Sequence, residues 1–419
     1  MKKKYRDDIW DFSKANTKKY THRFHQYPAM MIPQVAGKIL DEFGKNAKLL
    51  FDPYCGTGTS LVEANIRGID AIGTDINPLA RLIAIAKTTI ISLKTLDLYL
   101  KDFDDFIFNV NLGAIKVSPT VPDFKNIEYW FKKETQITLA IIKKYIEGVD
   151  DINIQNFFRV AFSETIREAS LTRNSEFKLY RMAKEQIEKF NPDVFSVMIS
   201  KLFRNRNGME EYIHLKNKDN IKSLIYDFNT VFEIPDKILS PESVDIVMTS
   251  PPYGDSRTTV AYGQFSRLSN QWLDIENANE IDKKSMGGKR LKDYIDFCFE
   301  PLDKVLKEIS KKDEKRVYDV ISFYIDYRQS IHNISKLVRE KGIVAFVVGN
   351  RRVKGIEIPN DEITKEFFEN NGFKHIKTII RKIPNKRMPR RNSPSNVVGI
   401  TETTMNYEYI LILKKENLQ

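Results

Sequence analysis

The fold is decided by the stretch Phe51-Asp52-Pro53-Tyr54-Cys55-Gly56-Thr57-Gly58-Thr59-Ser60. An apolar run, 47–51, stops at Asp52-Pro53, and glycines in the turn that follows let the backbone approach a ligand closely. Residues 60–69 then have helical spacing and end at Gly68, and residues 70–77 have the pattern of a second strand. The order strand, loop, helix, strand predicts a Rossmann-like, doubly wound parallel α/β sheet.

The rest of the chain divides into three parts. We expect residues 1–95 to form the first part of a catalytic domain, residues 96–220 to form a mostly helical insertion, and residues 221–419 to complete the domain. Strand-like runs return after the insertion as IKSLIYDF, SVDIVMTS, GIVAFVVGN and YEYILILKK. The basic, proline-containing segment 381–394 is expected to be a loop.

Composition narrows the class of protein. The 419 residues are 42% hydrophobic, which is enough for a sizeable core. The sequence has no uncharged apolar run of about 18 residues, the length that a membrane-spanning helix needs. The two cysteines, Cys55 and Cys298, are too few for a disulfide framework or a cysteine-based zinc site. We therefore expect a cytoplasmic protein without a structural metal.

The charge favours a polyanionic partner. The net charge is +11, although a lysine-rich protein can be basic for other reasons. Position strengthens the case, because residues 371–400 contain eight basic side chains and no acidic one. The residues expected to contact the phosphates of such a partner are Lys382, Lys386, Arg387, Arg390 and Arg391.

The glycine turn has the features of a nucleoside site. Asp75 ends the second predicted strand, 17 residues after Gly58, where a carboxylate can accept hydrogen bonds from both ribose hydroxyls. The turn lacks a third glycine at the dinucleotide spacing and the Lys-Ser/Thr of a P-loop, which disfavours nicotinamide and ATP. Asp75 can instead be a solvated turn residue, and Asp52 can cap the helix rather than face an ammonium group. Cys55 is interpreted as a small loop residue, not a nucleophile.

A second loop, Ser250-Pro251-Pro252-Tyr253, follows the apolar strand 244–248 and therefore lies at the carboxyl end of the sheet. Its prolines stiffen the turn. The Ser250 hydroxyl and the Pro251 carbonyl can accept hydrogen bonds from an amino group and turn its lone pair toward a methyl donor. Tyr253 offers a flat face to an unstacked base. A Pro-Pro turn alone is usually structural. The functional interpretation of this loop therefore depends on its occurrence in the same chain as the glycine turn.

The two loops, DPYCGTGT and SPPY, resemble the signatures of the DNA amino methyltransferases. The resemblance extends to 22–30, to GTDINPLA around Asp75 and to Tyr226-Asp227. It implies S-adenosylmethionine as cofactor, double-stranded DNA as substrate and Ser250, Pro251, Pro252 and Tyr253 as catalytic residues. The cofactor-binding residues that it implies are His25, Tyr27, Pro28, Asp52, Pro53, Cys55, Gly56, Gly58, Thr59, Asp75, Ile76 and Asp227.

The resemblance also suggests finer roles. The order of the loops implies that residues 96–220 take part in target recognition. Members with serine at the first position of the tetrapeptide mostly methylate cytosine N4, and adenine N6 stays open. We expect a prokaryotic protein that associates with the nucleoid when it binds DNA and that belongs to a restriction-modification system with a cognate restriction endonuclease.

Three other functions compete. An RNA guanine-N2 methyltransferase has similar loops, and Gly254 follows Tyr253 here, but only about 20 residues precede His22, which leaves no room for an RNA-binding module. A catalytically idle DNA-binding protein would not need intact loops. Cytosine-C5 chemistry needs a thiolate, and no Pro-Cys occurs. His22 and His25 make a poor metal ligand set.

Overall fold

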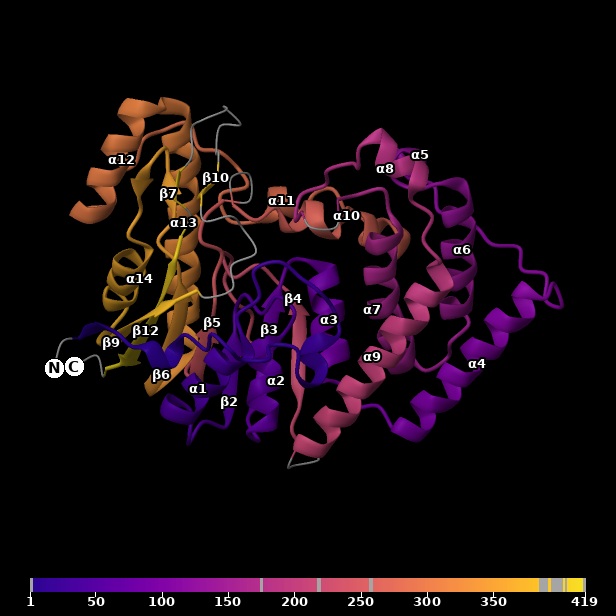
Figure 1. Ribbon diagram of the computed structural model, residues 1–419. Helices are drawn as coiled ribbons and strands as arrows, with labels where there is room; N and C mark the ends of the chain where they lie inside the picture. Colours follow the sequence, from indigo (N-terminus) through magenta and orange to yellow (C-terminus); the bar gives the residue numbers. More distant parts are fainter. Residues whose placement is uncertain are drawn as a thin grey trace.

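The computed structural model describes residues 3–173, 176–216, 220–255, 259–383, 391–392, 402–403 and 405–416. Its centre is an eight-stranded sheet in the order β1-β9-β12-β6-β5-β2-β3-β4 (Figure 1). The strands are β1 (Lys4–Arg6), β2 (Leu49–Asp52), β3 (Asp70–Asp75), β4 (Ser223–Asp227), β5 (Val244–Thr249), β6 (Val338–Val348), β9 (Phe373–Lys382) and β12 (Tyr407–Lys415). Two short ladders pair β7 (Arg352–Val353) with β8 (Ile356–Glu357) and β10 (Arg391–Asn392) with β11 (Glu402–Thr403).

Strand direction brings the two predicted loops together. Strands β4, β3, β2, β5 and β6 are parallel, whereas β12 runs antiparallel to both β6 and β9. Because β2 and β5 are parallel neighbours, the loops that follow them leave the same edge of the sheet. The predicted Rossmann-like α/β fold is confirmed.

Helices cover both faces of the sheet (Figure 1). One face packs against α12 (Glu300–Lys312), α13 (Glu314–Leu337) and α14 (Asn360–Glu369), and the other against α1 (Pro33–Phe43) and α2 (Thr59–Ile66). Alternate residues of one strand serve the two cores: Phe51 of β2 faces the first set of helices, and Leu50 faces the second. The predicted helix after the glycine turn is α2, and Gly68 beyond it has a φ of +74°.

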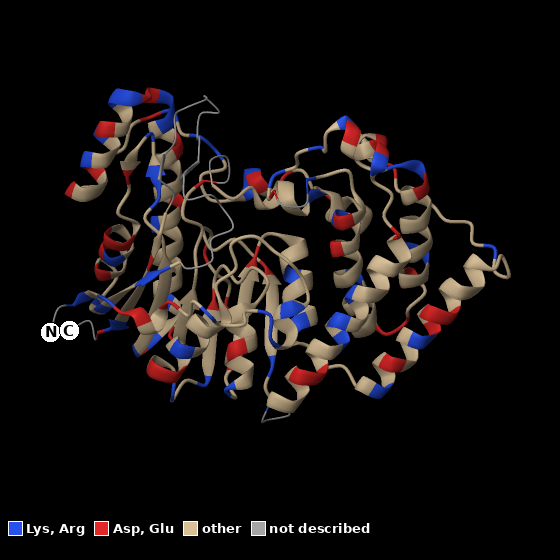
Figure 2. Ribbon diagram, viewed as in Figure 1, with Lys and Arg blue, Asp and Glu red and all other residues tan. Residues whose placement is uncertain are grey.

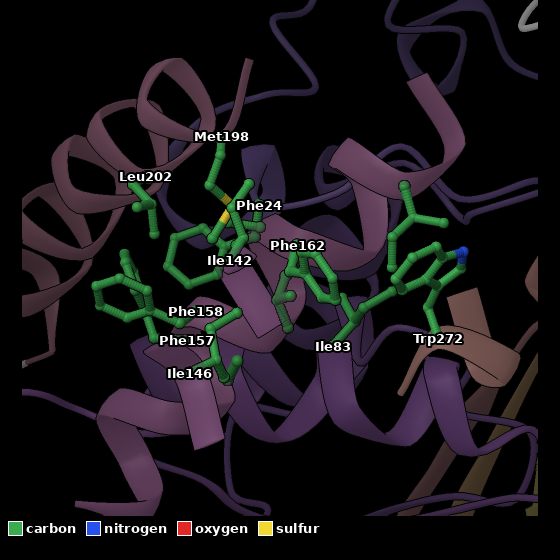
Figure 3. Packing of buried hydrophobic residues seen from close by; sticks show 14 of the residues in the cluster. Phe24, Ile83, Ile142, Ile146, Phe157, Phe158, Phe162, Met198, Leu202 and Trp272 are labelled. Carbon is green, nitrogen blue, oxygen red and sulfur yellow. The ribbon is translucent and has the colours of Figure 1, made fainter. Parts of the chain in front are cut away.

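The segment between β3 and β4 is helical. After α3 (Pro78–Thr88), six helices form a body beside the sheet, which we call the helical body (Figure 1). They are α4 (Leu93–Asn111), α5 (Ile127–Trp130), α6 (Lys133–Glu147), α7 (Ile152–Ala169), α8 (Lys184–Lys189) and α9 (Val194–Leu215). Phe157, Phe158 and Phe162 of α7 pack with Met198 and Leu202 of α9 in its core (Figure 3).

This core also draws on other parts of the chain. Helix α10 (Tyr262–Trp272) follows the predicted catalytic tetrapeptide Ser250–Tyr253, called the catalytic loop below, and contributes the fully buried Trp272. Phe24 enters from the N-terminal side, and Ile83 from α3 (Figure 3). The helical body is therefore built onto the sheet domain through shared core residues, and α10 joins it to the chain that leaves the catalytic loop.

The sequence patterns did not predict β1 or β9. Arg381 and Lys382, expected in a loop, continue β9, and Arg391 begins β10. Arg381 is buried because its guanidinium donates to the Trp10 carbonyl and pairs with Glu408 on β12. Among the described residues, no helix combines the length and apolarity that a membrane crossing requires.

Candidate active site

The glycine turn is held by short-range hydrogen bonds. The Gly58 amide donates to the Cys55 carbonyl (2.7 Å), and the Cys55 amide donates to the Thr74 carbonyl of β3 (3.0 Å). Gly58 has a φ of +72°, and a Cβ at this position would lie 3.0 Å from the Cβ of Ala84. Glycine therefore allows both the left-handed turn and the close approach of α3.

Asp75 fixes the turn from the next strand. One carboxylate oxygen accepts from the Gly56 amide (3.0 Å), and the other accepts from the Asn77 amide (2.7 Å). Burial raises the pKa of this carboxyl group against these hydrogen bonds, which favour its charged form. A carboxylate has about four acceptor sites, so two remain for a ligand.

Asp52 links the glycine turn to β5, the strand that leads into the catalytic loop. Oδ1 accepts from the Tyr54 amide (3.1 Å) and from the hydroxyl of Thr249 (2.5 Å), the last residue of β5. Oδ2 accepts from the hydroxyl of Ser60 in α2. Burial raises the pKa of Asp52 to about 6. One buried carboxylate thus ties the loops after β2 and β5 to each other.

A pocket of about 970 Å³, partly open to solvent, lies at this edge of the sheet. Eleven predicted site residues line it: Tyr27, Pro28, Asp52, Pro53, Cys55, Gly56, Thr59, Asp75, Ile76, Ser250 and Pro252. Residues of the glycine turn, called the cofactor loop below, and of the catalytic loop therefore share one cavity.

Five predicted residues do not line the pocket: His25, Gly58, Asp227, Pro251 and Tyr253. His25 instead lies against Phe265 of α10, with ring centroids 6.3 Å apart, and burial lowers its pKa to about 4, so the ring is neutral. Asp227 pairs with Arg81 of α3 (2.8 Å) and is largely exposed.

Sequence reasoning missed several residues of the pocket wall. Phe228, Asn229 and Thr230 follow β4, and their place after a strand adjacent to β3 was a usable signal. Tyr262 of α10 also lines the pocket and stacks on Tyr27, with centroids 5.9 Å apart and planes 17° from parallel. No local pattern marks Tyr262, because its position depends on how α10 packs. The remaining missed residues are Ala29, Met30, Met31, Tyr54, Thr57, Ser60, Asn77, Ile281, Ser285 and Met286.

The wall beyond β4 is held by α13. The Asn333 amide group donates to three successive carbonyls, those of Thr230 (3.1 Å), Val231 (3.1 Å) and Phe232 (2.9 Å). Ser330 lies one helical turn before Asn333, and its hydroxyl is 2.6 Å from the hydroxyls of both Thr230 and Tyr54. Helix α13 thus fixes both the pocket wall formed by the residues after β4 and the start of the glycine turn.

The catalytic loop depends on distant anchors. The Tyr253 hydroxyl lies 3.2 Å from the Ser250 hydroxyl and donates to Glu408 of β12 (3.3 Å). The Tyr253 carbonyl accepts from the amide group of Asn360 (3.3 Å). Burial raises the pKa of the Tyr253 hydroxyl well above its usual value, so the hydroxyl keeps its proton. The tyrosine ring is therefore held by its polar end.

A buried ion network lies behind this loop. Asp255 accepts from Arg316 of α13 (2.8 Å) and from Arg351 (3.3 Å), and Arg316 also donates to Asp319 (2.9 Å). Gly254 lies so close to Arg351 that a Cβ would come within 2.0 Å of its guanidinium. A larger residue after the tetrapeptide would therefore displace the Arg351 guanidinium from its place beside Asp255.

The predicted DNA-contacting residues fall mostly outside the described residues. Lys382 ends β9, and its amide donates to Asp11 (2.7 Å). Lys386, Arg387 and Arg390 lie outside the described residues, and only the backbone of Arg391 is described. Both cysteines are free, with Cys55 buried and Cys298 exposed. In the described ranges, no group of three or more His, Cys, Asp or Glu residues forms a set that could hold a metal ion.

Comparison with known proteins assigns the family. The N6/N4 methyltransferase family, described as DNA methylase, matches residues 1–86. The Type II methyltransferase M.MvaI of Kocuria varians is 43% identical over 423 aligned residues, which cover 96% of this chain and 93% of that protein. The chain belongs to the N6/N4 DNA methylase family. The predicted family is thereby confirmed.

Two further similarities of this DNA methylase are weaker. The Type II methyltransferase M.BsoBI of Geobacillus stearothermophilus is 23% identical, over 87% of this chain and 80% of its own. Among solved structures, the rRNA methyltransferase aviRa of Streptomyces viridochromogenes aligns over 93% of this chain and 88% of its own, with 10% identity and a TM-score of 0.33. The assignment rests on the sequence relatives.

S-adenosylmethionine is the cofactor of this DNA methylase, and DNA is its substrate. The residues of the pocket fit this cofactor. Asp75 has acceptor sites left for ribose hydroxyls, and Asp52 offers a carboxylate to an ammonium group. Ile76 and Phe228 add apolar wall beside them. The predicted cofactor is confirmed.

Proposed function

We propose that this DNA methylase transfers a methyl group from S-adenosylmethionine to the N4 amine of cytosine in double-stranded DNA. The observation that carries the proposal is Ser250, which begins the catalytic tetrapeptide and lines the same pocket as Asp52 and Asp75. Two relatives named as Type II methyltransferases support a restriction-modification system, with a cognate endonuclease as its other enzyme and the bacterial cytoplasm as its place.

The chain's part in the reaction is to position the amine. The nitrogen lone pair of cytosine N4 is delocalised into the ring, so the free amine is a poor nucleophile. The Ser250 hydroxyl and the Pro251 carbonyl accept hydrogen bonds from its two hydrogens and turn the lone pair toward the methyl donor. S-adenosylmethionine, held by Asp75 and Asp52, would supply the methyl group, and the proton that the methylated amine sheds would pass to water at the open mouth of the pocket.

Tyr253 receives the base outside the duplex. Reaching an amino group inside DNA requires extruding the nucleotide, and stacking on an aromatic ring can return about 1–3 kcal/mol of that cost. Contacts from Ser250 and Glu408 hold the hydroxyl end of the ring, so the ring needs little further ordering when a base arrives.

Other regions take roles in DNA binding and recognition. We assign part of the choice of DNA sequence to residues 96–220, which include most of the helical body. We assign phosphate contacts to Lys382, Lys386, Arg387, Arg390 and Arg391. On the cofactor side, we assign the ribose to Asp75 and the ammonium group to Asp52. His25 and Asp227 support these residues from outside the pocket.

Mass spectrometry of digested product DNA tests the proposal. N4-methylcytosine is expected; N6-methyladenine would refute the base assignment and keep the family, and 5-methylcytosine would overturn the mechanism. Tyr253→Ala should lower turnover about 5–150-fold, the equivalent of the missing stacking energy, and leave cofactor binding nearly intact. Cys298→Ser, on the exposed surface, is the matched control and should retain full activity without any covalent protein–DNA adduct.

A further inference from the structure

A second basic segment lies outside the one noted in the sequence. Residues 283–292, Lys-Lys-Ser-Met-Gly-Gly-Lys-Arg-Leu-Lys, contain five basic side chains and no acidic one. The segment starts in α11 (Ile281–Lys284) and runs toward α12. We call it the lysine loop. Its four lysines, Lys283, Lys284, Lys289 and Lys292, are all exposed.

The backbone of the lysine loop is fixed by α13. The Gly287 amide donates to Asp326 (2.8 Å), and the Leu291 amide donates to the Ser322 hydroxyl (2.9 Å). Gly287 has a φ of +69°, and a Cβ on Gly288 would lie 2.1 Å from the Lys283 carbonyl oxygen. The two glycines therefore permit a tight turn that no larger residue would allow, and exposed lysines that serve only for solubility would not need one.

The same segment forms part of the rim of the active-site pocket. Ile281, Ser285 and Met286 line the cavity that Ser250 and Pro252 also line. Lys283 and Lys284 stand between these lining residues in the sequence and point to solvent, with Lys284 3.8 Å from Glu280. In Figure 1, α11 lies between the helical body and α13, and in Figure 2 the ribbon there carries the blue of its lysines.

An ion chain connects the lysine loop to the catalytic loop. Arg290 makes a two-pronged contact with Asp319 (2.6 Å for each bond), and Asp319 accepts from Arg316. Arg316 in turn donates to Asp255, two residues after Tyr253. Arg290 therefore serves to anchor the lysine loop, and this ion chain fixes the position of the loop relative to the catalytic tetrapeptide.

We propose that the lysine loop binds the DNA phosphate backbone beside the extruded nucleotide. The inference rests on the proposed function in one respect, because it takes a base in DNA as the group that enters the pocket. Extrusion brings phosphates of the target strand toward the pocket mouth, and cations fixed there offset the repulsion between them. These contacts carry no sequence information, so the lysine loop strengthens binding to every DNA sequence.

Salt-dependent binding to a fluorescently labelled random-sequence duplex tests this role. The test variant replaces Lys283, Lys284, Lys289 and Lys292 by Gln. The matched control replaces four exposed lysines near the amino ends of β2, β4 and β6, at the opposite edge of the sheet: Lys45, Lys48, Lys222 and Lys341. The test variant should reduce the slope of log K against log salt by about 0.9 for each DNA phosphate that a lysine no longer neutralises, and the control should keep the slope.

Further measurements separate the explanations. Cofactor affinity by calorimetry and the thermal midpoint should match the parent protein, and a Lys→Arg version at the same four positions should restore the slope. An unchanged slope in the Gln variant, or an equal change in the control, would overturn the proposal. The readout is independent of which base is methylated, so a different product would refute the base assignment and leave this result standing.

Discussion

The cofactor loop and the catalytic loop leave the same edge of the sheet but are supported differently. The contacts of Asp75 with Gly56 and of Ser60 with Asp52 span 19 and 8 residues of sequence. The contacts of Tyr253 with Asn360 and Glu408 span 107 and 155 residues. The cofactor loop is therefore shaped mainly by its own strand, loop and helix, and the catalytic loop by the completed fold.

This difference explains which substitutions should separate the two functions. A local contact can be broken with an effect on cofactor binding alone, because the catalytic loop does not use it. A remote contact of Tyr253 should affect turnover alone. Asp52 is the exception, since it accepts hydrogen bonds from both sides, through Ser60 and Thr249.

The largest effect is expected for Asp52, because its carboxylate contacts both the cofactor-loop side and the catalytic strand β5. Its carboxyl pKa is 3.8 when unperturbed and about 6 in the fold, so the folded protein binds more protons between these values and loses stability as pH rises through them. The loss is on the order of 3 kcal/mol at full ionisation. Asp52→Asn removes the ionisable group and with it this loss of stability. The thermal midpoint of the variant minus that of the parent should therefore increase from pH 4 to pH 6. Parallel curves for the two proteins would contradict the assignment.

Asp75→Ala should act on the cofactor side only. It removes the acceptor of the Gly56 and Asn77 amides, together with the two acceptor sites left for the ribose. Cofactor affinity should fall by about 1.5–3 kcal/mol, the range for hydrogen bonds to a charged group. Calorimetry measures this directly, and affinity for DNA without cofactor serves as the control, which should not change. Unaltered cofactor binding would exclude Asp75 from the site.

Asn333→Ala tests whether a contact that is remote in sequence also supports the cofactor pocket, because Asn333 holds the pocket wall that follows β4. Three carbonyls in the wall beyond β4 lose their donor, and the free energy of unfolding should fall by about 1–2 kcal/mol. Denaturant titration measures the loss. The cofactor dissociation constant should rise, while turnover at saturating cofactor stays within about twofold of the parent, roughly the 0.4 kcal/mol that twofold represents. A fall in turnover with normal cofactor affinity would show that this wall serves catalysis instead.

Glu408→Gln gives the smallest expected effect. The amide can still accept from the Tyr253 hydroxyl, but it loses the charge that pairs with Arg381. The catalytic step should slow by about 0.5–1.5 kcal/mol, or roughly 2–10-fold, at an unchanged cofactor dissociation constant. Single-turnover rates separate this change from product release. If cofactor binding weakened instead, Glu408 would act on the whole fold and not through Tyr253.

The sequence predicted most of what is local. The strand ending at Asp52, the glycine turn, α2 and Asp75 follow from residues within one βαβ unit, and all appear at the expected places. The tetrapeptide could also be placed, since a buried strand leads into it. Eleven of the predicted site residues meet in one pocket for this reason.

The sequence could not predict contacts that depend on packing. Tyr262 and Met286 reach the pocket through the placement of α10 and α11. Strand β9 was missed because its basic residues masked the alternation, although Arg381 is buried by pairing with Glu408. Asn333 carries no signal at all, because a mid-helix asparagine looks the same whether it faces solvent or three carbonyls.

The position of β12 has a consequence for how the protein is made. This strand is the last of the described chain, yet it lies inside the sheet, between β6 and β9, and β1 joins the sheet only through β9. A ribosome delivers the complete cofactor loop early and the Glu408 strand late. The residues of the cofactor loop therefore leave the ribosome well before the strand that supplies the acceptor of Tyr253. Tyr253 gains its Glu408 acceptor only after β12 has paired with β6 and β9.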